Sequence, residues 1–131
     1  MLVSIQYKTK ENDLTVFYLA ACHNVDYVYE NPEEARKINC YALKNFLETM
    51  TNVKKLFFAS TDCVYGENGE IPLLKESSPL KPVNEYGKQK IEAENIVLSK
   101  GFTVTVTDTD KRTYTVTTSK SNSVTRSNLL V

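Results

Sequence analysis

Two strand-like runs on either side of one long amphipathic segment constrain the fold of this chain more than any other feature. Residues 14–21 (LTVFYLAA) and 54–59 (KKLFFA) have strand length, and the first run is rich in β-branched and aromatic residues. Between them, apolar residues recur at helical spacing over 32–50, namely Ala35, Ile38, Ala42, Leu43, Phe46, Leu47 and Met50. A strand, a helix and a second strand in this order predict a βαβ unit, which requires a parallel sheet and a right-handed crossover.

Residues with special backbone roles mark the ends of the predicted helices. Asn31 is a candidate N-cap, and Pro32 fits the first helical position. A second helix is predicted from about residue 84 to residue 100, where Gly101 provides a stop. Residues 66–83 hold three of the four prolines and show no period, which predicts a long loop of a kind that often binds ligands. The predicted fold class is α/β, a partial doubly wound, mainly parallel sheet with flanking helices.

The last part of the chain has a different composition. Apolar residues alternate over 102–106 and 114–116, on either side of residues 108–112, which predicts a possible C-terminal β-hairpin. From Ser119 onward the sequence is rich in Ser, Thr and Asn, which is typical of a disordered tail. We therefore expect a partial α/β domain over 1–107 and a Thr/Ser-rich hairpin or tail over 108–131.

Composition excludes several classes of function. The chain has 131 residues, near the usual size of one domain, and its 16 basic residues balance 16 acidic ones, so we expect no binding to nucleic acid or to a membrane surface. No apolar run is long enough to span a bilayer, and Met1 is followed by a polar stretch rather than by the apolar core of a signal peptide. Three cysteines without metal-like spacing and a single histidine predict reduced thiols, no metal site and a cytoplasmic location.

Tyr86 and Lys90 form the strongest chemical signal in the sequence. Residues four apart project from one face of a helix, so an ammonium there is expected to lower the pKa of the tyrosine from about 10 toward the range of a general acid/base. Ser60-Thr61-Asp62 directly follows the second predicted strand, at the end where open α/β sheets hold ligands, and can face the same site as Tyr86. The alternative is that a Tyr-x-x-x-Lys step arises by chance on a solvated helix.

Six segments follow one another in the order found in a known superfamily. They are Leu19–Ala21, Asn31–Ala35, Lys37–Asn39, Ser60–Gly66, Glu76–Pro82 and Tyr86–Glu94. In these segments, and over residues 13–101 as a whole, the chain resembles the extended short-chain dehydrogenase/reductases, which form the NAD-dependent epimerase/dehydratase superfamily. It is most similar to the dTDP-4-dehydrorhamnose reductases of dTDP-rhamnose biosynthesis. The resemblance implies that region 1–107 is part of an NAD(P)-binding, Rossmann-like domain.

The resemblance also implies roles for four residues at the reacting atoms. Tyr86 would be the acid/base that exchanges a proton with a sugar oxygen while a hydride moves to or from the adjacent carbon. Lys90 would lower the pKa of Tyr86 and hydrogen-bond the nicotinamide ribose. Thr61 would bind the same substrate oxygen, and Asp62 would also contact the substrate.

NADPH or NADH is the cofactor that the resemblance implies. Leu19, Ala20 and Ala21 would line it, together with Tyr86 and Lys90. Asn39 matches an asparagine that contacts the cofactor in the family. A second interpretation is open for Asn39, namely a buried or boundary asparagine whose amide is satisfied by backbone groups.

The implied function is NAD(P)H-dependent reduction of a 4-keto nucleotide sugar, with nucleotide-sugar 4-epimerisation as an alternative. Dehydration is disfavoured, because Cys63 stands where the related dehydratases carry a carboxylic acid. Since the family often dimerises through two helices packed as a four-helix bundle, the resemblance implies a homodimer through helices 32–50 and 84–100.

One departure from the family pattern leaves two further alternatives open. All glycines follow the first predicted strand, at Gly66, Gly69, Gly87 and Gly101, so the sequence has no Gly-rich turn on which a pyrophosphate could rest. The first half of the family's cofactor domain is then missing, and the sheet is expected to present an unpaired edge. An inactive fragment, or a non-catalytic regulatory or binding module of the same fold, is compatible with this pattern.

Overall fold

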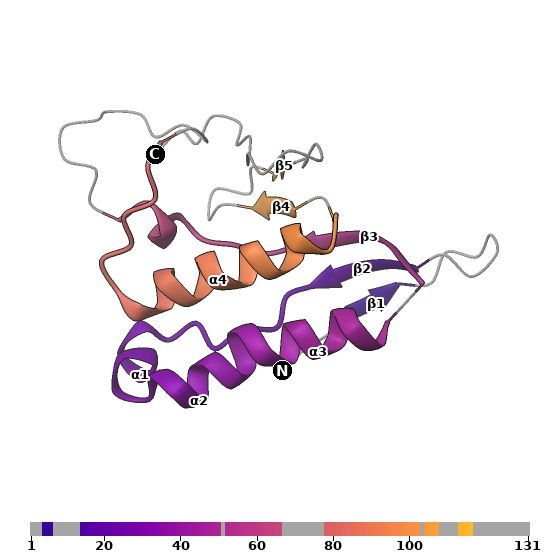
Figure 1. Ribbon diagram of the computed structural model, residues 1–131. Coiled ribbons are helices and arrows are strands. Elements are labelled where there is room, and N and C mark those ends of the chain that lie inside the picture. Colours follow the sequence, from indigo (N-terminus) through magenta and orange to yellow (C-terminus); the bar gives the residue numbers. More distant parts are fainter. Residues whose placement is uncertain are drawn as a thin grey trace.

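A computed structural model describes residues 4–6, 14–50, 52–66, 78–102, 104–107 and 113–116 of the chain (Figure 1). The strands are β1 (Ser4–Gln6), β2 (Leu14–Tyr18), β3 (Val53–Phe58), β4 (Val104–Thr107) and β5 (Thr113–Val116). The helices are α1 (Val25–Glu30), α2 (Pro32–Arg36), the π-helix η1 (Lys37–Tyr41), α3 (Ala42–Thr49), the 3₁₀ turn η2 (Asp62–Val64) and α4 (Glu85–Ser99). The order along the chain alternates strands with helices, as in α/β domains.

The predicted βαβ unit is present. Strands β2 and β3 pair in parallel, with Val16 opposite Leu56 and Tyr18 opposite Phe58. Both strands end slightly earlier than the sequence predicted, because the backbone leaves the sheet after Tyr18 and after Phe58. The fold class is confirmed as α/β with a small sheet flanked by helices.

The sheet edge that was expected to be unpaired is covered. Strand β1 pairs antiparallel with β2, with Ser4 opposite Phe17 and Gln6 opposite Thr15, so the sheet order is β1-β2-β3. Strand β1 therefore stands beside β2, and among the described strands the edge on this side of the sheet is β1 itself. A short segment before β2, which the sequence pattern did not mark as a strand, supplies the missing hydrogen bonds.

The predicted helix over 32–50 is one continuous helical segment with a change of pitch in its middle. Helix α2 leads into η1, where the backbone takes π geometry, and α3 follows directly. Pro32 occupies the first turn as predicted, but the side chain of Asn31 makes no capping hydrogen bond. Its amide nitrogen instead donates to the carbonyl of Tyr27 at 3.3 Å. The preceding helix α1, which the sequence analysis treated as a loop, begins at an Asn24 side chain that accepts from the Tyr27 N–H at 2.9 Å.

Helix α4 follows its sequence signals closely. The side chain of Asn84 caps it by accepting from the Gly87 N–H at 2.7 Å. Gly101 ends it with a φ of 77°, in the left-handed region that favours glycine.

Both long helical segments pack on the same face of the sheet. Along β2 the buried side chains alternate, and the core brings every second strand residue together with α3 and α4. The members of this core are Leu14, Val16, Tyr18, Ala20, Leu43, Leu47, Val53, Leu56, Phe58, Ala93 and Val97. On the opposite face, the half-buried rings of Phe17 and Phe57 stack with centroids 4.5 Å apart.

The predicted C-terminal hairpin is confirmed. Strands β4 and β5 pair antiparallel, with Val106 opposite Tyr114, and β4 lies next to β3. The disordered tail predicted from Ser119 lies outside the described residues, as does 67–77 of the predicted loop, while 78–84 contain neither helix nor strand. The division into regions 1–107 and 108–131 stays a prediction. Among the described helices, none combines the length and apolar character needed to cross a bilayer.

Candidate active site

The carboxyl ends of β2 and β3 bring two loops together at one edge of the sheet. The Ala59 N–H donates to the Tyr18 carbonyl at 3.3 Å, which extends the parallel pairing one step beyond β3. Residues 19–24 and 59–61 therefore leave the sheet side by side. In open α/β sheets this edge is where ligands bind.

Helix α4 begins against this edge because residue 87 has no side chain. A Cβ at Gly87 would lie 2.6 Å from the carbonyl oxygen of Cys63 and 3.0 Å from the Cβ of Pro82. Such an approach of helix to backbone is open only to glycine. Tyr86, in the same turn, is buried at 9 % exposure. It packs among Val28, Ala35, Cys22 and Cys63.

Thr61 and Asp62 lie at the start of η2, the turn that contacts α4. The Thr61 hydroxyl accepts from the Cys63 N–H at 3.3 Å and donates to an Asp62 carboxylate oxygen at 3.3 Å. Thr61 is half-buried, while Asp62 is exposed. The structure thus brings the strand end that carries Thr61 and the helix start that carries Tyr86 into one neighbourhood, as the motif spacing predicted.

The pKa of Tyr86 moves in the direction opposite to the one expected from the sequence. Burial raises it, and the nearby Cys63, Asp62 and Cys22 raise it further. In this structure Tyr86 is therefore a protonated phenol and a proton donor. The expected lowering by Lys90 is absent because the ammonium of Lys90 is engaged elsewhere.

Lys90 points at the end of β3. Its Nζ donates to the Ala59 carbonyl at 2.5 Å and lies 4.1 Å from the centre of the Phe58 ring. Only 3 % of Lys90 is exposed, and this burial lowers its pKa to about 8, while Glu94 acts in the opposite direction. A lysine held in this way is both a hydrogen-bond donor at the sheet edge and a group that titrates near neutral pH.

Glu94 is a site residue to which the sequence analysis assigned no role. It is buried at 4 % exposure, and its carboxylate accepts a short hydrogen bond from the Ser60 hydroxyl. The signal was available, because Glu94 follows Lys90 by four residues on one helix face. Ser60, Lys90 and Glu94 thus form a polar cluster under the loop that carries Thr61.

The residues expected to line a cofactor differ in how far they are exposed to solvent. Leu19 is 56 % exposed, Ala20 is buried and Ala21 is half-buried, all at the carboxyl edge of the sheet. Asn39 is 3 % exposed and adopts the second of its two interpretations. Its Oδ1 accepts from the Cys22 N–H at 2.8 Å, and its Nδ2 donates to the Cys22 carbonyl at 3.1 Å and to the Gln89 Oε1 at 3.0 Å. Direct contact of Asn39 with a cofactor stays a prediction.

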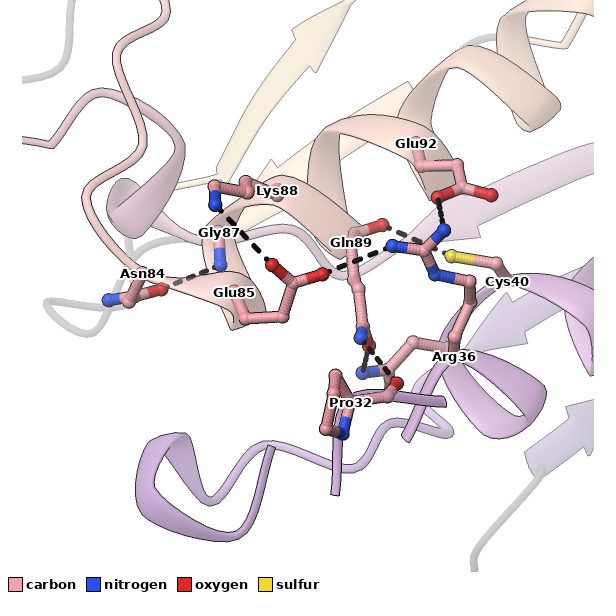
Figure 2. Close-up of polar contacts among 10 residues, drawn as sticks. Pro32, Arg36, Cys40, Asn84, Glu85, Gly87, Lys88, Gln89 and Glu92 are labelled. Carbon is pink, nitrogen blue, oxygen red and sulfur yellow. Dashed lines mark hydrogen bonds and ion pairs between the residues drawn. The ribbon is translucent and has the colours of Figure 1, made fainter. Parts of the chain in front are cut away.

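Polar contacts join α4 to α2 (Figure 2). Arg36 reaches across, with one guanidinium nitrogen 3.1 Å from Glu85 and the other 3.7 Å from Glu92. Lys88 lies 3.4 Å from the second oxygen of Glu85. These partly exposed ion pairs contribute little stability one by one. The two pairs of Arg36 connect α2 to α4, whereas the Lys88–Glu85 pair lies within α4.

The three cysteines form no disulfide in the structure. Burial raises the pKa of Cys40 to about 12, so it is an inert thiol in the folded protein. Within the described ranges no group of three or more His, Cys, Asp or Glu side chains is arranged to hold a metal ion.

Comparison with known proteins agrees with this geometry. Residues 7–126 match the family model described as GDP-mannose 4,6 dehydratase. The chain belongs to this family. The membership confirms the predicted NAD-dependent epimerase/dehydratase superfamily, whose enzymes modify nucleotide sugars with a nicotinamide cofactor.

The curated proteins similar to this chain include UDP-glucose 4-epimerases. The UDP-glucose 4-epimerase of Streptococcus mutans is 31% identical over 97 residues, which are 72% of this chain and 29% of the relative. That of Halalkalibacterium halodurans is 36% identical over 84 residues, or 63% of this chain and 25% of the relative. The chain therefore spans between a quarter and a third of the length of these relatives.

Solved structures of the same superfamily superpose on the described fold. The UDP-Glc/GlcNAc 4-epimerase of Campylobacter jejuni matches with a TM-score of 0.67 and 30% identity, covering 75% of this chain and 32% of that one. MoeE5 in complex with UDP-glucose and NAD matches with a TM-score of 0.62 and 27% identity over 72% of this chain and 33% of that one. A hypothetical dTDP-4-dehydrorhamnose reductase from Sulfolobus tokodaii matches with a TM-score of 0.60 and 27% identity, covering 72% of this chain and 34% of that one. The curated relatives named above are 4-epimerases, and the reductase named here is a solved structure.

Proposed function

We propose that this chain carries the proton-transfer part of a nucleotide-sugar active site that acts at a sugar C4 hydroxyl or keto group, as in the 4-epimerases. The observation that carries the proposal is the buried Tyr86 phenol at the start of α4, packed against the turn that follows Thr61. The 4-epimerase relatives support the choice of reaction. Tyr86, Lys90 and Thr61 are the residues to which we assign catalysis.

The residues at the sheet edge fit the nicotinamide half of a dinucleotide better than its pyrophosphate half. Exposed Leu19 and the small side chains of Ala20 and Ala21 lie at the carboxyl edge, and the Lys90 ammonium is a donor at the end of β3. For the pyrophosphate, the sequence has no Gly-rich turn before β2. We therefore assign Leu19–Ala21, Tyr86 and Lys90 to the nicotinamide and ribose, and no residue to the adenine half. When bound, the cofactor would accept a hydride from the sugar carbon or return it.

The chain's own groups would handle the proton. For this step Tyr86 must first lose its own proton, because its raised pKa keeps the phenol protonated. As the phenolate it takes the proton of the C4 hydroxyl when the hydride leaves that carbon, and it gives the proton back to the carbonyl oxygen when the hydride returns. The Thr61 hydroxyl hydrogen-bonds the same oxygen and holds it against Tyr86. Asp62, exposed beside Thr61, is assigned to substrate binding.

A second candidate, reduction of a 4-keto nucleotide sugar, is favoured by one observation. Burial raises the pKa of Tyr86, which keeps the phenol protonated and suits it to donate a proton to a keto oxygen. Epimerisation needs the same residue to act as a base as well. The similarity to a hypothetical dTDP-4-dehydrorhamnose reductase supports this candidate.

The test uses the chain as it stands. We expect calorimetric titration to detect NADH binding at concentrations up to millimolar. Incubation with UDP-glucose and NAD⁺ is expected to give the C4 epimer, read by proton NMR. The Tyr86→Phe variant should lower the rate by about 10²–10⁴-fold, whereas Tyr29→Phe, at a 78 % exposed tyrosine, should leave it unchanged.

The outcomes separate the alternatives. Oxidation of NADPH by a 4-keto nucleotide sugar, without epimer formation, would select the reductase candidate. If neither cofactor binds at millimolar concentration and no product forms, this chain alone is not an enzyme. The fragment and the non-catalytic module would then be the explanations left, and a stable complex with another protein would favour the module.

We further propose a homodimer through the segments 32–50 and 84–100, and a cytoplasmic location in keeping with three free thiols. Ile38 and Tyr41, at 37 % and 49 % exposure, give the outer side of the first segment an apolar component. Such side chains are common where helices pack between subunits.

A further inference from the structure

Two buried side-chain amides meet between α4 and the π-helix η1. Gln89 is 0 % exposed and Asn39 is 3 % exposed, and the Asn39 Nδ2 donates to the Gln89 Oε1 at 3.0 Å. Figure 2 shows Gln89 reaching from α4 toward the carbonyl of Pro32, to which its Nε2 donates at 2.8 Å. A buried amide without hydrogen-bond partners costs stability. These two amides are partners of each other, and their other hydrogen bonds show which segments of the chain they connect.

The hydrogen bonds run in one direction from loop to helix. The Cys22 N–H donates to the Asn39 Oδ1, the Asn39 Nδ2 donates to Gln89, and the Gln89 Nε2 donates to Pro32. Flipping either amide would set oxygen against oxygen or nitrogen against nitrogen. The chain of bonds therefore has a single orientation, and it is broken by any change that removes one donor.

Two members of this series of hydrogen bonds, Cys22 and Gln89, lie close to Tyr86. Gln89 stands one helical turn after Tyr86 and directly before Lys90. Cys22 follows Leu19–Ala21 in the loop after β2, and it packs against Tyr86. The loop is thus tied to α4 twice, by direct packing and through Asn39.

The π-helix η1 supplies two consecutive buried residues, Asn39 and Cys40, to the contact with α4. The Cys40 thiol donates to the Gln89 carbonyl at 3.4 Å, so η1 contacts both the backbone and the side chain of Gln89. Single π turns inside helices are often found at functional sites.

We propose that Gln89 is a positioning residue that acts through Asn39 to hold the loop 19–24 in register with Tyr86. The coupling itself is structural. Its use, which is to align the nicotinamide side of the site with the acid/base, rests on the proposed function.

The test reads the loop directly and needs neither cofactor nor substrate. Native protein is labelled with 4,4′-dithiodipyridine, and the rates at the half-buried Cys22 and Cys63 are followed by mass spectrometry of peptides. Cys63 takes no part in the hydrogen bonds that join Cys22 to Gln89 through Asn39, and it serves as the internal reference. Cys40, which is fully buried, reacts only if the protein unfolds. Failure of the proposed function would leave this readout unaffected.

Replacing Gln89 by Met keeps the length of the side chain and removes its hydrogen bonds. In Gln89→Met we expect the ratio of Cys22 to Cys63 labelling to rise about tenfold over wild type, which is about 1.4 kcal/mol, while Cys40 stays protected, because the Asn39 amide loses its partner on α4. Lys88→Met, at the adjacent exposed position, should leave the ratio unchanged. An unchanged ratio in folded Gln89→Met would overturn the proposal.

A second variant separates hydrogen bonding from packing. In Gln89→Glu the protonated acid donates to Pro32 and accepts from Asn39, as glutamine does, whereas the carboxylate sets an oxygen against the Pro32 carbonyl. Burial raises the pKa of such a carboxyl. The labelling ratio, divided by that of wild type at the same pH, should therefore be normal at pH 5 and raised at pH 7. Dividing by the wild-type ratio at the same pH cancels any effect of pH that the two proteins share. The charged and titratable groups around Gln89, which both proteins have, are Arg36, Cys40, Glu85, Lys90 and Glu92.

Each result of this variant decides the matter. A ratio that is the same at both pH values shows that the side chain only fills space, and the proposal fails. If Gln89→Met exposes Cys40, the Gln89→Glu comparison alone carries the test. If Gln89→Glu is unfolded even at pH 5, the protonated acid does not replace the amide, which also contradicts the proposal.

Discussion

At the scale of single residues, burial dominates the electrostatics of the candidate site. Tyr86 and Lys90 lie on one helix turn, yet the pKa of the tyrosine is raised and that of the lysine is lowered to about 8, in both cases first by burial. Each shift favours the neutral form, as expected for groups taken out of water. The charge of Glu94 partly offsets the lowering of the Lys90 pKa, and the Lys90 ammonium donates a hydrogen bond to the Ala59 carbonyl.

The lowered pKa of Lys90 predicts how stability depends on pH. Below about pH 8 the lysine is charged in both the folded and the unfolded chain. Between about pH 8 and 10 the folded form releases its proton while the unfolded form, with a pKa of about 10.4, keeps it, so the unfolded state binds more protons and stability rises with pH. We expect the free energy of unfolding of wild type, minus that of Lys90→Met, to rise across this window by at most about 1.4 kcal/mol per pH unit.

Urea denaturation at half-unit steps of pH measures this difference. Lys88→Met, which removes an exposed lysine from the same helix, should show no such rise relative to wild type. The window ends near pH 10, because above that pH the lysine of the unfolded chain also releases its proton. A difference that stays flat from pH 8 to 10 would contradict the assignment of a lowered pKa to Lys90.

At the scale of the elements, the start of α4 is the part that builds the site. The Asn84 cap fixes where the helix begins, and Gly87 lets that first turn touch the backbone at Cys63. The ion pairs of Arg36 with Glu85 and Glu92 hold the same turn against α2. Tyr86 is buried because three elements converge on one helical turn.

Gly87→Ala is predicted to disturb this convergence. A Cβ 2.6 Å from the Cys63 carbonyl oxygen meets backbone rather than a flexible side chain, so α4 and η2 must move apart. Although alanine is the better helix former, we expect a loss of about 1–3 kcal/mol in the free energy of unfolding, measured by chemical denaturation. Lys88→Ala is the control and should change stability by less than about 0.5 kcal/mol. A Gly87→Ala protein as stable as wild type would show that the contact yields easily.

At the scale of the whole molecule, the described chain is a small α/β layer with one well-covered face. Helices α3 and α4 bury the core face of the sheet, β1 runs antiparallel to β2, and β4 of the antiparallel β4–β5 hairpin lies next to β3. The opposite face carries the stacked rings of Phe17 and Phe57. Since the chain spans only about a third of the structures it resembles, it corresponds to one part of their architecture.

The proposed homodimer is a prediction at this scale. Light scattering coupled to size exclusion should give twice the mass of one chain. Tyr41→Glu, which places a charge on the outer side of the first helical segment, should shift the protein toward the monomer by more than tenfold in dissociation constant, because an interface core disfavours an unpaired charge. Tyr29→Glu on α1 is the matched control. A monomer at the highest accessible concentration would exclude a dimer through this face.

Much of the fold was determined by local sequence signals. The apolar runs near 14–21 and 54–59, the helical period over 32–50 and the Asn84 and Gly101 signals each predicted an element at nearly its observed position. Local pattern is sufficient there because strand alternation, helical period and capping depend on neighbouring residues alone. The short β1 and α1 escaped prediction, since three to six residues carry too little periodicity.

The candidate site divides in the same way. By itself the sequence predicted Thr61 at the carboxyl end of a parallel strand, because a βαβ crossover leaves few alternatives. It also predicted Tyr86 and Lys90 on one face of the next helix, because they are four residues apart. Only the tertiary structure decided that Lys90 bonds Ala59 and that Asn39 joins Cys22 to Gln89. The reason is physical. Hydrogen-bond partners and pKa shifts of buried groups depend on which backbone atoms are left without water, and packing between distant segments settles that.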